Sequence, residues 1–413
     1  MAGREETELA RWAAGALEGL LAARTAAVRA TAPASAAPPS VPLLTLTGGL
    51  PDPETLPRDE LAEVTRLVLA REGREALQYG GPQGFLGLRE VLAERASRRE
   101  GLELTAENFM LASGSAHALA NFCFTFVDPG DPVIVENPSF SGSIRTIRAH
   151  QAEVITVPVD REGLRTDALA EALERLAAAG RRAKFIYTIP TFHNPTGSTM
   201  TLARRRELLE LAARHRVLVL EDDAYGELRY EGEPVPSLYA LSGGEGVVRI
   251  GTFSKTLASG LRLGWTMARK EYVDALVRMR LDMGTSPFAS RVVAEYAASG
   301  RLDRHVTRML ALYREKRDTM LSALERYCAR WATWERPEGG FFLWLRLAPG
   351  ADCGTVVRTG LELGVATVAG TGFYSDGDGA GYVRLAFSYV ALEEIEEAVR
   401  RLGAALARVY EGA

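Results

Sequence analysis

Short apolar runs alternate with helical patterns between about residues 79 and 304, and this alternation constrains the fold more than any other feature. The runs are rich in Val, Ile and Leu and lie at residues 133–135, 154–157, 185–189, 217–220 and 247–250. Residues 201–215 carry leucines on one helix face, with Thr201 as a suitable N-cap. Strands that alternate with helices are joined by right-handed crossovers. We therefore expect an α/β fold with a mostly parallel sheet sandwiched by helices, and ligands at the carboxyl ends of its strands.

The pattern changes after about residue 305. It predicts helices at 307–327, 355–363 and 392–410, strands at 339–345 and 382–387, and a Gly/Asp loop at 372–381. This is the pattern of a smaller α+β domain. The length of 413 residues favours two to three domains. We divide the chain into an N-terminal segment at 1–75 that packs with the small domain, a large domain at 76–305 and a small C-terminal domain at 306–413. Within the N-terminal segment, residues 4–29 predict an amphipathic helix.

Composition excludes several classes of function. The formal net charge is -4, so nothing favours a nucleic acid or an anionic membrane as partner. No apolar stretch is long enough to span a bilayer. Cys123, Cys328 and Cys353 are far apart, and the five histidines show no ligand spacing, so we expect neither a disulfide framework nor a catalytic metal. A reducing cytoplasm fits this pattern best.

One lysine stands in an unusual setting. Lys255 follows the apolar run at 247–250, with Thr252 and Ser254 before it and Arg262 after it. The chain has only four lysines, Lys184, Lys255, Lys270 and Lys316. Lysine can lose its proton and become a nucleophile, whereas arginine cannot. An amine near hydroxyls and a guanidinium suits a carbonyl cofactor that carries a phosphate, although a solvated lysine at a strand end explains this stretch equally well.

Other polar groups follow the neighbouring predicted strands. Asn194 precedes Pro195, which keeps it out of the helical region and lets its amide project from a turn. Three acids, Glu221-Asp222-Asp223, follow a buried strand and need partners. One of them could pair with a protonated ring nitrogen, and Tyr225 could donate its hydroxyl. An ordinary Asn-Pro turn and an exposed acidic loop are the structural alternatives.

Three further features complete the set. Residues 113–117 open a helix whose free N–H groups could bind an anion, although a Ser/Gly cap explains them as well. Phe140 could stack on a flat ring or simply pack in the core. Arg384 lies between apolar neighbours and could bind a substrate carboxylate or form a structural salt bridge. Each feature has a plain structural explanation on its own, but together they describe one cofactor, pyridoxal 5'-phosphate (PLP).

The sequence resembles the fold-type I PLP enzymes of the class I/II aminotransferase family. Within the family it is similar to the branch that holds 2-aminoadipate, kynurenine and multi-substrate aminotransferases. The matching motifs run in family order and are Gly48-Gly49-Leu50-Pro51, Gln78-Tyr79-Gly80, Ser113-Gly114-Ser115, Glu136-Asn137-Pro138-Ser139-Phe140, Thr188-Ile189-Pro190-Thr191-Phe192-His193-Asn194-Pro195-Thr196-Gly197, Glu221-Asp222-Asp223-Ala224-Tyr225, Ser254-Lys255 with Arg262, Pro337-Glu338-Gly339-Gly340, and Arg384.

The resemblance implies how the cofactor is held in the large domain. Lys255 would carry PLP covalently and act as the catalytic base, while Asp222 would pair with the ring nitrogen. The phenolic oxygen would be contacted by Asn194 and Tyr225, and the ring would stack on Phe140. The groups implied to hold the phosphate are Thr252, Ser254, Arg262, Ser115 and the backbone N–H of Ala116.

The resemblance also implies substrates and partners. Arg384 would bind the substrate α-carboxylate, with Gly49 and Asn194 beside it. Tyr79 would reach the phosphate of a neighbouring subunit, which implies a homodimer with shared active sites. Ala116-His117 and Phe140 depart from the residues that the family often has, Gln and Tyr, and both departures bear on substrate preference.

The implied function is transfer of an amino group from an α-amino acid to a 2-oxo acid, with 2-oxoglutarate as the expected acceptor and a ping-pong mechanism. A PLP-dependent β-lyase or decarboxylase on the same scaffold is an alternative. So is a non-catalytic effector-binding module like those of bacterial transcription regulators. The stretch before Gly48 reads as one helix and a linker rather than a helix-turn-helix reader, which favours the enzyme.

Overall fold

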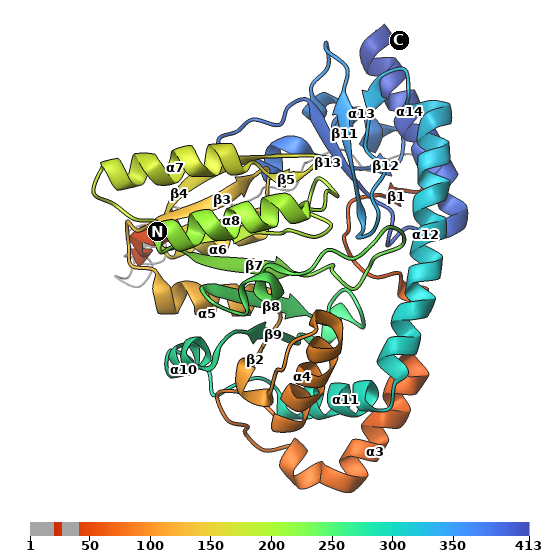
Figure 1. Cartoon of the computed structure of the whole chain (residues 1–413). Coiled ribbons are helices and arrows are strands. Elements are labelled where there is room, and N and C mark those ends of the chain that lie inside the picture. Colours follow the sequence, from red (N-terminus) through yellow and green to blue (C-terminus); the bar gives the residue numbers. More distant parts are fainter. Residues whose placement is uncertain (1–19, 27–40, 413) are drawn as a thin grey trace, which may run out of the picture.

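The computed structural model describes residues 20–26 and 41–412. Its centre is an eight-stranded sheet in the order β2-β9-β8-β7-β6-β3-β4-β5 (Figure 1). The strands are β2 (Phe109–Ala112), β3 (Pro132–Asn137), β4 (Glu153–Asp160), β5 (Gly163–Leu164), β6 (Phe185–Thr188), β7 (Leu218–Asp223), β8 (Val247–Thr252) and β9 (Gly264–Met267). The expected α/β fold is confirmed.

The middle of the sheet is parallel. Strands β4, β3, β6, β7 and β8 pair in parallel in that order, and they are the five strands predicted from the apolar runs. Strands β9, β2 and β5 were not predicted, and each pairs antiparallel with its neighbours. The whole sheet is therefore mixed, with a parallel centre whose carboxyl ends meet at one edge.

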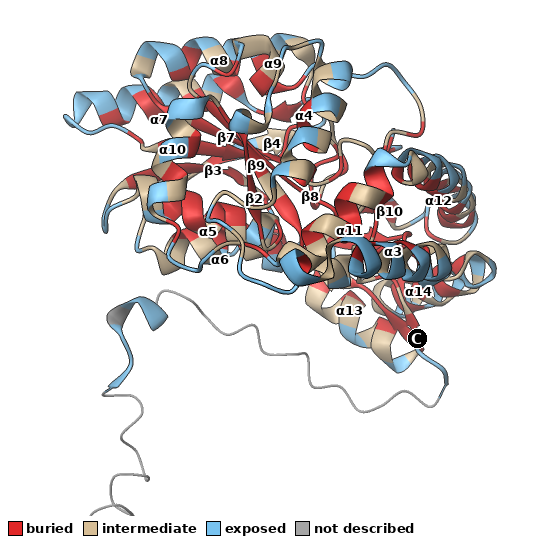
Figure 2. Ribbon diagram, turned by 90° about the horizontal axis from the view of Figure 1, so that it is seen from below, coloured by how far each residue is buried: buried red, intermediate tan, exposed pale blue. Residues whose placement is uncertain are grey.

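Helices cover both faces of this sheet. In Figure 2 the buried strands lie between α7, α8 and α9 on one side and α5 and α6 on the other. The helices of this part are α3 (Arg58–Ala76), α4 (Leu86–Glu100), α5 (Ser115–Phe126), α6 (Ser141–Ala149), α7 (Thr166–Ala178), α8 (Leu202–His215), α9 (Leu238–Ser242), α10 (Lys270–Arg278) and α11 (Pro287–Ala298). The predicted N-cap of α8 is confirmed, because the Thr201 side chain accepts a hydrogen bond from the Arg204 N–H.

The C-terminal residues form a second lobe. Its antiparallel sheet has the order β10-β11-β14-β13. The strands are β10 (Ala332–Thr333), β11 (Phe342–Leu347), β13 (Val368–Ala369) and β14 (Tyr382–Ala386), and they are accompanied by α13 (Cys353–Glu362) and α14 (Ile395–Glu411). Single turns of 3-10 helix occur at η1 (Ala23–Thr25), η2 (Pro53–Thr55), η3 (Ala106–Asn108), η4 (Ser259–Leu261), η5 (Gly370–Phe373) and η6 (Leu392–Glu394).

The long helix α12 (Arg301–Tyr327) runs along both lobes (Figure 1). It was predicted to begin at Thr307, and it begins six residues earlier. The reason is packing, because Leu302, His305 and Val306 are buried and extend the apolar stripe toward the N-terminus. The predicted division at residue 305 falls inside this helix, and the domain limits remain a prediction.

The N-terminal segment contacts both lobes. Strand β1 (Leu44–Thr45) pairs in parallel with β12 (Val365–Ala366) of the C-terminal lobe, whereas α3 packs against α11. Most of the helix predicted at residues 4–29 lies outside the described residues. Among the helices that the structure describes, none is both long and apolar enough to cross a lipid bilayer.

Candidate active site

A cavity of about 420 Å³ lies where the carboxyl ends of β6, β7 and β8 face strand β14 of the C-terminal lobe. The residues around it are Gly48, Gly49, Leu50, Ser115, Ala116, Phe140, Ile189, Asn194, Asp222, Ala224, Tyr225, Thr252, Ser254, Lys255, Ser259, Arg262, Phe342 and Arg384. Every site residue predicted from the sequence is among them except Tyr79. Residues far apart in the chain thus converge on one cavity.

Lys255 follows β8 and points at the N-terminal segment. Its Nζ donates a hydrogen bond to the Gly49 carbonyl oxygen at 2.6 Å. Burial lowers the pKa of Lys255 to about 8, and the positive charges of Arg384 and Arg262 act in the same direction. A lysine with this pKa is partly neutral near physiological pH, so it can serve as a nucleophile and as a base.

The three consecutive acids of β7 have different partners. Glu221 accepts hydrogen bonds from the N–H groups of Leu238 and Tyr239, at 3.1 and 3.0 Å. Asp223 points away from the cavity and pairs with two arginines. Only Asp222 lines the cavity. Of the three acids, only Asp222 is therefore placed to contact a bound ligand.

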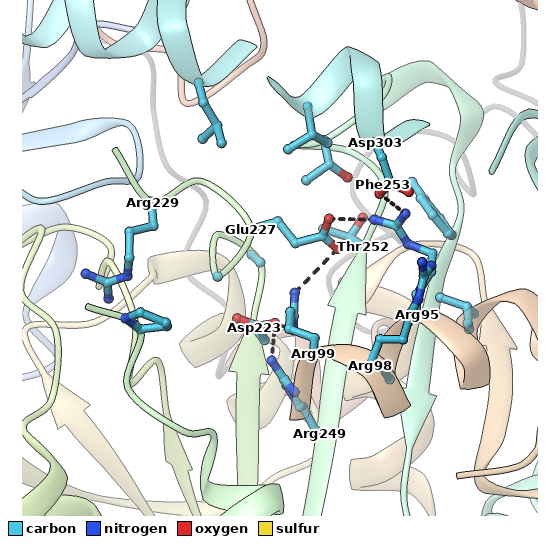
Figure 3. A pocket seen from close by; sticks show the side chains of 18 of the residues that line it. Arg95, Arg98, Arg99, Asp223, Glu227, Arg229, Arg249, Thr252, Phe253 and Asp303 are labelled. Atoms are coloured by element: carbon cyan, nitrogen blue, oxygen red, sulfur yellow. Dashed lines mark hydrogen bonds and ion pairs between the residues drawn. The ribbon is translucent and has the colours of Figure 1, made fainter. Parts of the chain in front are cut away.

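Asp223 belongs to an ion-pair cluster beside a second, larger cavity of about 670 Å³ (Figure 3). Its Oδ2 lies 2.5 Å from Arg249 and 3.0 Å from Arg99, and Arg249 also contacts Glu100 at 2.6 Å. Burial alone would raise the pKa of Asp223, but Arg249 and Arg99 outweigh it and hold the pKa at about 2. The negative charge of Asp223, next to Asp222 in the chain, is thus neutralised by arginines on the side away from the active-site cavity.

Asp222 has one satisfied oxygen and one free oxygen. Its Oδ2 accepts a hydrogen bond from the Tyr187 hydroxyl at 2.7 Å, and Ser143 Oγ lies 2.8 Å from the same hydroxyl. Its Oδ1 is buried without a hydrogen-bond partner in the described residues. Burial raises the pKa of Asp222 to about 7, against the opposing effect of Tyr187. A buried acceptor without a donor fits a protonated ring nitrogen.

Tyr187 and Ser143 extend the hydrogen-bond network of Asp222, and sequence reasoning missed both. Tyr187 is completely buried in β6, where it was interpreted as part of an apolar strand. The sequence held one signal for Tyr187, a hydroxyl within the apolar run at 185–189. A buried tyrosine O–H needs a hydrogen-bond partner. Ser143 lies in α6 with no motif around it.

A polar cradle forms one end of the cavity. Arg262 Nη2 donates to the Ser113 carbonyl oxygen at 3.3 Å, and its Nη1 lies 3.5 Å from Ser254 Oγ. Helix α5 begins beside it at Ser115, after Gly114 with φ 89°. This positive φ favours glycine, and a Cβ on Gly114 would lie 2.7 Å from Arg262 Nη2, so another residue would displace the guanidinium. The hydroxyls, the guanidinium and the helix N-terminus together suit a phosphate.

Arg384 forms the opposite end. Its guanidinium carbon lies 4.5 Å above the Phe342 ring and 4.8 Å from the Phe373 ring. Its Nη1 donates to Asn194 Oδ1 at 2.9 Å and its Nη2 to the Thr47 carbonyl at 2.6 Å, while its buried Nε has no partner in the described residues. Burial lowers the pKa of Arg384 to about 10, which still leaves the group charged at neutral pH. A fixed cation of this kind suits a carboxylate.

Tyr79 is the predicted site residue that the structure does not bring to the cavity. It is 86% exposed. Leu77, Leu281 and Met283 are further large apolar side chains that are exposed. A Cβ on Gly284 would lie 2.4 Å from the Gly81 carbonyl oxygen, which places the segment after Tyr79 beside the segment that holds Leu281 and Met283.

Comparison with known proteins agrees with this geometry. The profile of the family "Aminotransferase class I and II" matches residues 46–402. The aromatic-amino-acid aminotransferase 1 of Thermococcus litoralis is 38% identical over 362 residues, 87% of each chain. The multiple substrate aminotransferase of Thermococcus profundus superposes with a TM-score of 0.88 at 34% identity, over 96% of this chain and 99% of the other.

A third relative concerns the cofactor. The α-aminoadipate aminotransferase LysN of Thermus thermophilus, complexed with N-(5'-phosphopyridoxyl)-L-leucine, superposes with a TM-score of 0.84 at 36% identity, over 90% of this chain and 94% of the other. The residues present here fit PLP, because the cavity offers a lysine, a phosphate cradle and the free buried oxygen of Asp222. The chain belongs to the class I and II aminotransferases and is a PLP-dependent transaminase.

Proposed function

We propose that this enzyme moves the amino group of an α-amino acid to a 2-oxo acid by a ping-pong mechanism, with 2-oxoglutarate as the acceptor. The observation that carries the proposal is the arrangement of Lys255, Asp222 and Arg384 around one cavity. Two of these residues keep a buried polar atom without a partner in the described residues, Asp222 Oδ1 and Arg384 Nε. One is an acceptor and the other is a donor, so a zwitterionic substrate and a protonated ring would satisfy both.

PLP, when bound, supplies the carbonyl that links to amino groups and the ring that takes up electrons from the substrate α-carbon. Lys255 holds the cofactor covalently and, once released, removes the proton from the α-carbon as general base. Its pKa of about 8 suits this task, because a base is most effective when its pKa lies near the working pH. Asp222, in its carboxylate form, keeps the ring nitrogen protonated.

Eight further residues orient the cofactor in this proposal. Phe140 is 40% exposed and offers its ring as a stacking surface. Asn194 uses its oxygen for Arg384, so its NH₂ group is the end that would donate to the phenolic oxygen. Tyr225 would donate its hydroxyl to the same oxygen. The groups that would hold the phosphate are Arg262, Thr252, Ser254, Ser115 and the Ala116 N–H.

Arg384 binds the α-carboxylate of both substrates in turn, with Gly49 and Asn194 beside the same group. Each half-reaction needs the same carboxylate site, so the first oxo acid leaves before the second one binds. The guanidinium packs on the rings of Phe342 and Phe373, and these contacts restrict its position in the cavity. A fixed planar donor recognises a carboxylate with both geometry and charge.

The experiment that tests the reaction is a single-turnover half-reaction. Enzyme with PLP is mixed with aromatic amino acids, 2-aminoadipate or glutamate, and the absorbance spectrum is followed. Accumulation of the pyridoxamine form with one equivalent of oxo acid supports transamination, and 2-oxoglutarate should then restore the original spectrum. Ammonia or carbon dioxide as the product would instead identify a lyase or a decarboxylase. Binding without chemistry would identify an effector module, and Lys255→Ala is the inactive control.

We also propose a homodimer with shared active sites and a cytoplasmic location. The dimer is supported by the exposed Tyr79, which would reach the phosphate of a second subunit, and by the exposed apolar side chains Leu77, Leu281 and Met283. The cytoplasm is supported by three cysteines that are free and buried. Equilibrium sedimentation tests the dimer, and a monomer with full activity would contradict the shared site.

A further inference from the structure

Lys316 is one of the four lysines of the chain, and its side chain is completely buried in α12. Its Nζ donates to an oxygen of Asp52 and to the carbonyl oxygens of Ser388 and Val390, at 3.1 Å for Ser388 and 2.6 Å for Val390. An ammonium group has three N–H donors and no acceptor. All three donors are therefore used, and they join α12 to two segments that lie far from it in the sequence.

Asp52 is held at several points. Its Oδ1 accepts from the Glu54 N–H at 2.8 Å, and its backbone N–H donates to the Tyr313 hydroxyl at 2.9 Å. Tyr313 lies one turn before Lys316 on the same helix, so side chains of α12 bind both the backbone N–H and the carboxylate of Asp52. Because the partners are a charged pair in a buried place, losing one of them leaves the other without compensation.

The segment just before Asp52 forms a wall of the active site. Three consecutive carbonyl oxygens of this segment accept from three different side chains. Arg384 donates to Thr47 at 2.6 Å, Ser388 to Gly48 at 3.5 Å and Lys255 to Gly49 at 2.6 Å. Ser388 is also one of the residues that Lys316 holds through its carbonyl.

The approach is close at Gly49. A Cβ there would lie 2.5 Å from the Phe342 ring, so the segment fits against this ring only with glycine. Because the segment lies so close to the Phe342 ring, its position in the site must be held by contacts elsewhere. Outside the cavity, Lys316 and Tyr313 hold one end of the segment at Asp52, and backbone hydrogen bonds hold the other end at Leu46. Lys316 itself does not line the cavity.

We propose that Lys316, through Asp52 and Ser388, is a positioning residue that holds the Gly48–Gly49 carbonyls in place for Lys255. The ammonium form of Lys255 keeps its hydrogen bond to the Gly49 carbonyl oxygen only while this segment stays in place. If bonding to the cofactor took Lys255 away from Gly49, the segment would be held by Arg384 at Thr47, by Ser388 at Gly48 and by Lys316 at Asp52. The proposal rests on the role proposed above for Lys255.

The test reads the acidity of Lys255 directly. The full-length enzyme is prepared in its pyridoxamine phosphate form, in which Lys255 is free, with lysine labelled by carbon-13 at Cε. Four lysines give four resonances, and Lys255→Ala identifies the relevant one. The variant Lys316→Met with Asp52→Asn removes the ion pair without leaving a lone charge. The milder Tyr313→Phe removes one hydroxyl, and Leu402→Ala truncates a buried side chain of the same lobe as a control for stability.

We expect the titration midpoint of Lys255 to fall in the double variant, since a weakened hydrogen bond to Gly49 favours the neutral amine. Tyr313→Phe should shift it less in the same direction, and Leu402→Ala should not shift it. The ratio kcat/KM should fall by about tenfold to a hundredfold in the double variant, as expected for a misplaced site. If the double variant fails to fold, the shift in Tyr313→Phe decides.

An unchanged midpoint in the folded variants, or an equal shift in Leu402→Ala, would overturn the proposal. The titration does not depend on which reaction the enzyme performs. An enzyme that fails the half-reaction test but shows the shifted midpoint would therefore refute the proposed function and keep the positioning role.

Discussion

Tyr187 donates a hydrogen bond to Asp222 at 2.7 Å and occupies one oxygen of this carboxylate, while the other oxygen has no partner among the described residues. The two residues come from neighbouring parallel strands, β6 and β7. Their pairing fixes the direction in which the free oxygen points. The role proposed for Asp222 therefore depends on a tyrosine that does not itself line the cavity.

Tyr187→Phe should reduce kcat/KM by about tenfold or more, because hydrogen bonds to charged groups are worth about 1.5–3 kcal/mol. The variant keeps the ring in the core and removes only the donor, so the pKa of Asp222 should rise. The acidic limb of the pH profile should then move to higher pH, because more base is needed to keep the carboxylate ionised. Tyr239→Phe, a buried tyrosine outside the cavity, is the matched control. An unshifted acidic limb in Tyr187→Phe would argue against this role.

Arg384→Lys should weaken turnover of amino acids far more than turnover of amines without a carboxylate. The lysine keeps the charge but loses the planar pair of donors and the contact with Phe342. We expect a loss in kcat/KM of about a hundredfold for α-amino acids, equal to roughly 3 kcal/mol. Half-reactions with an aromatic amino acid and the corresponding amine measure the difference. Equal losses for both compounds would contradict carboxylate binding by Arg384.

The ion-pair cluster around Arg249 should make the free energy of unfolding depend on pH in the acidic range. Burial raises the pKa of Glu100 and Asp223, but Arg249 and Arg99 outweigh it and hold both at about 2 in the fold. Their contribution to the free energy of unfolding is present above the unfolded pKa values near 4 and is lost as the pH falls toward 2. We expect each carboxylate to contribute about 2 kcal/mol. Denaturant unfolding between pH 7 and pH 2 measures this loss.

Arg249→Met should be less stable than the parent at pH 7 and should lose less stability between pH 4.5 and pH 2. It leaves the two carboxylates without their shared partner. Arg326→Met, which removes an exposed ion pair with Glu396, should change stability little at either pH. Parallel pH curves for Arg249→Met and the parent enzyme would refute this account of the cluster.

The proposed shared active site predicts complementation between two inactive variants. If Tyr79 serves the neighbouring subunit, a hybrid dimer of Tyr79→Ala and Lys255→Ala contains one intact site with Lys255 from one chain and Tyr79 from the other. Mixing the two variants under conditions that exchange subunits should restore activity that neither homodimer has. A mixture that stays as inactive as its components would place Tyr79 outside the site.

Residues at the ends of predicted strands were the most accessible to sequence reasoning. Lys255, Asn194 and Asp222 stand within five residues of the ends of apolar runs, and the carboxyl ends of parallel strands meet at one edge of a sheet. Their convergence therefore followed from the fold class. The resemblance to a known family supplied the roles, which composition and spacing alone left open.

Other parts depend on tertiary contacts that a local pattern does not contain. Strand β9 is only four residues long and gains its place by pairing with both β2 and β8. The start of α12 at Arg301 depends on what Leu302 and Val306 pack against. Tyr187 and Lys316 were hidden because each is defined by a partner far away in the sequence, Asp222 and Asp52.

The most direct test of the central claim is to find where the cofactor is attached. The PLP-loaded enzyme is reduced with borohydride, digested and examined by peptide mass spectrometry. We predict a single phosphopyridoxyl adduct on Lys255, one of only four lysines in the chain. An adduct on Lys184, Lys270 or Lys316, or an enzyme that retains no B6 compound at all, would contradict the account.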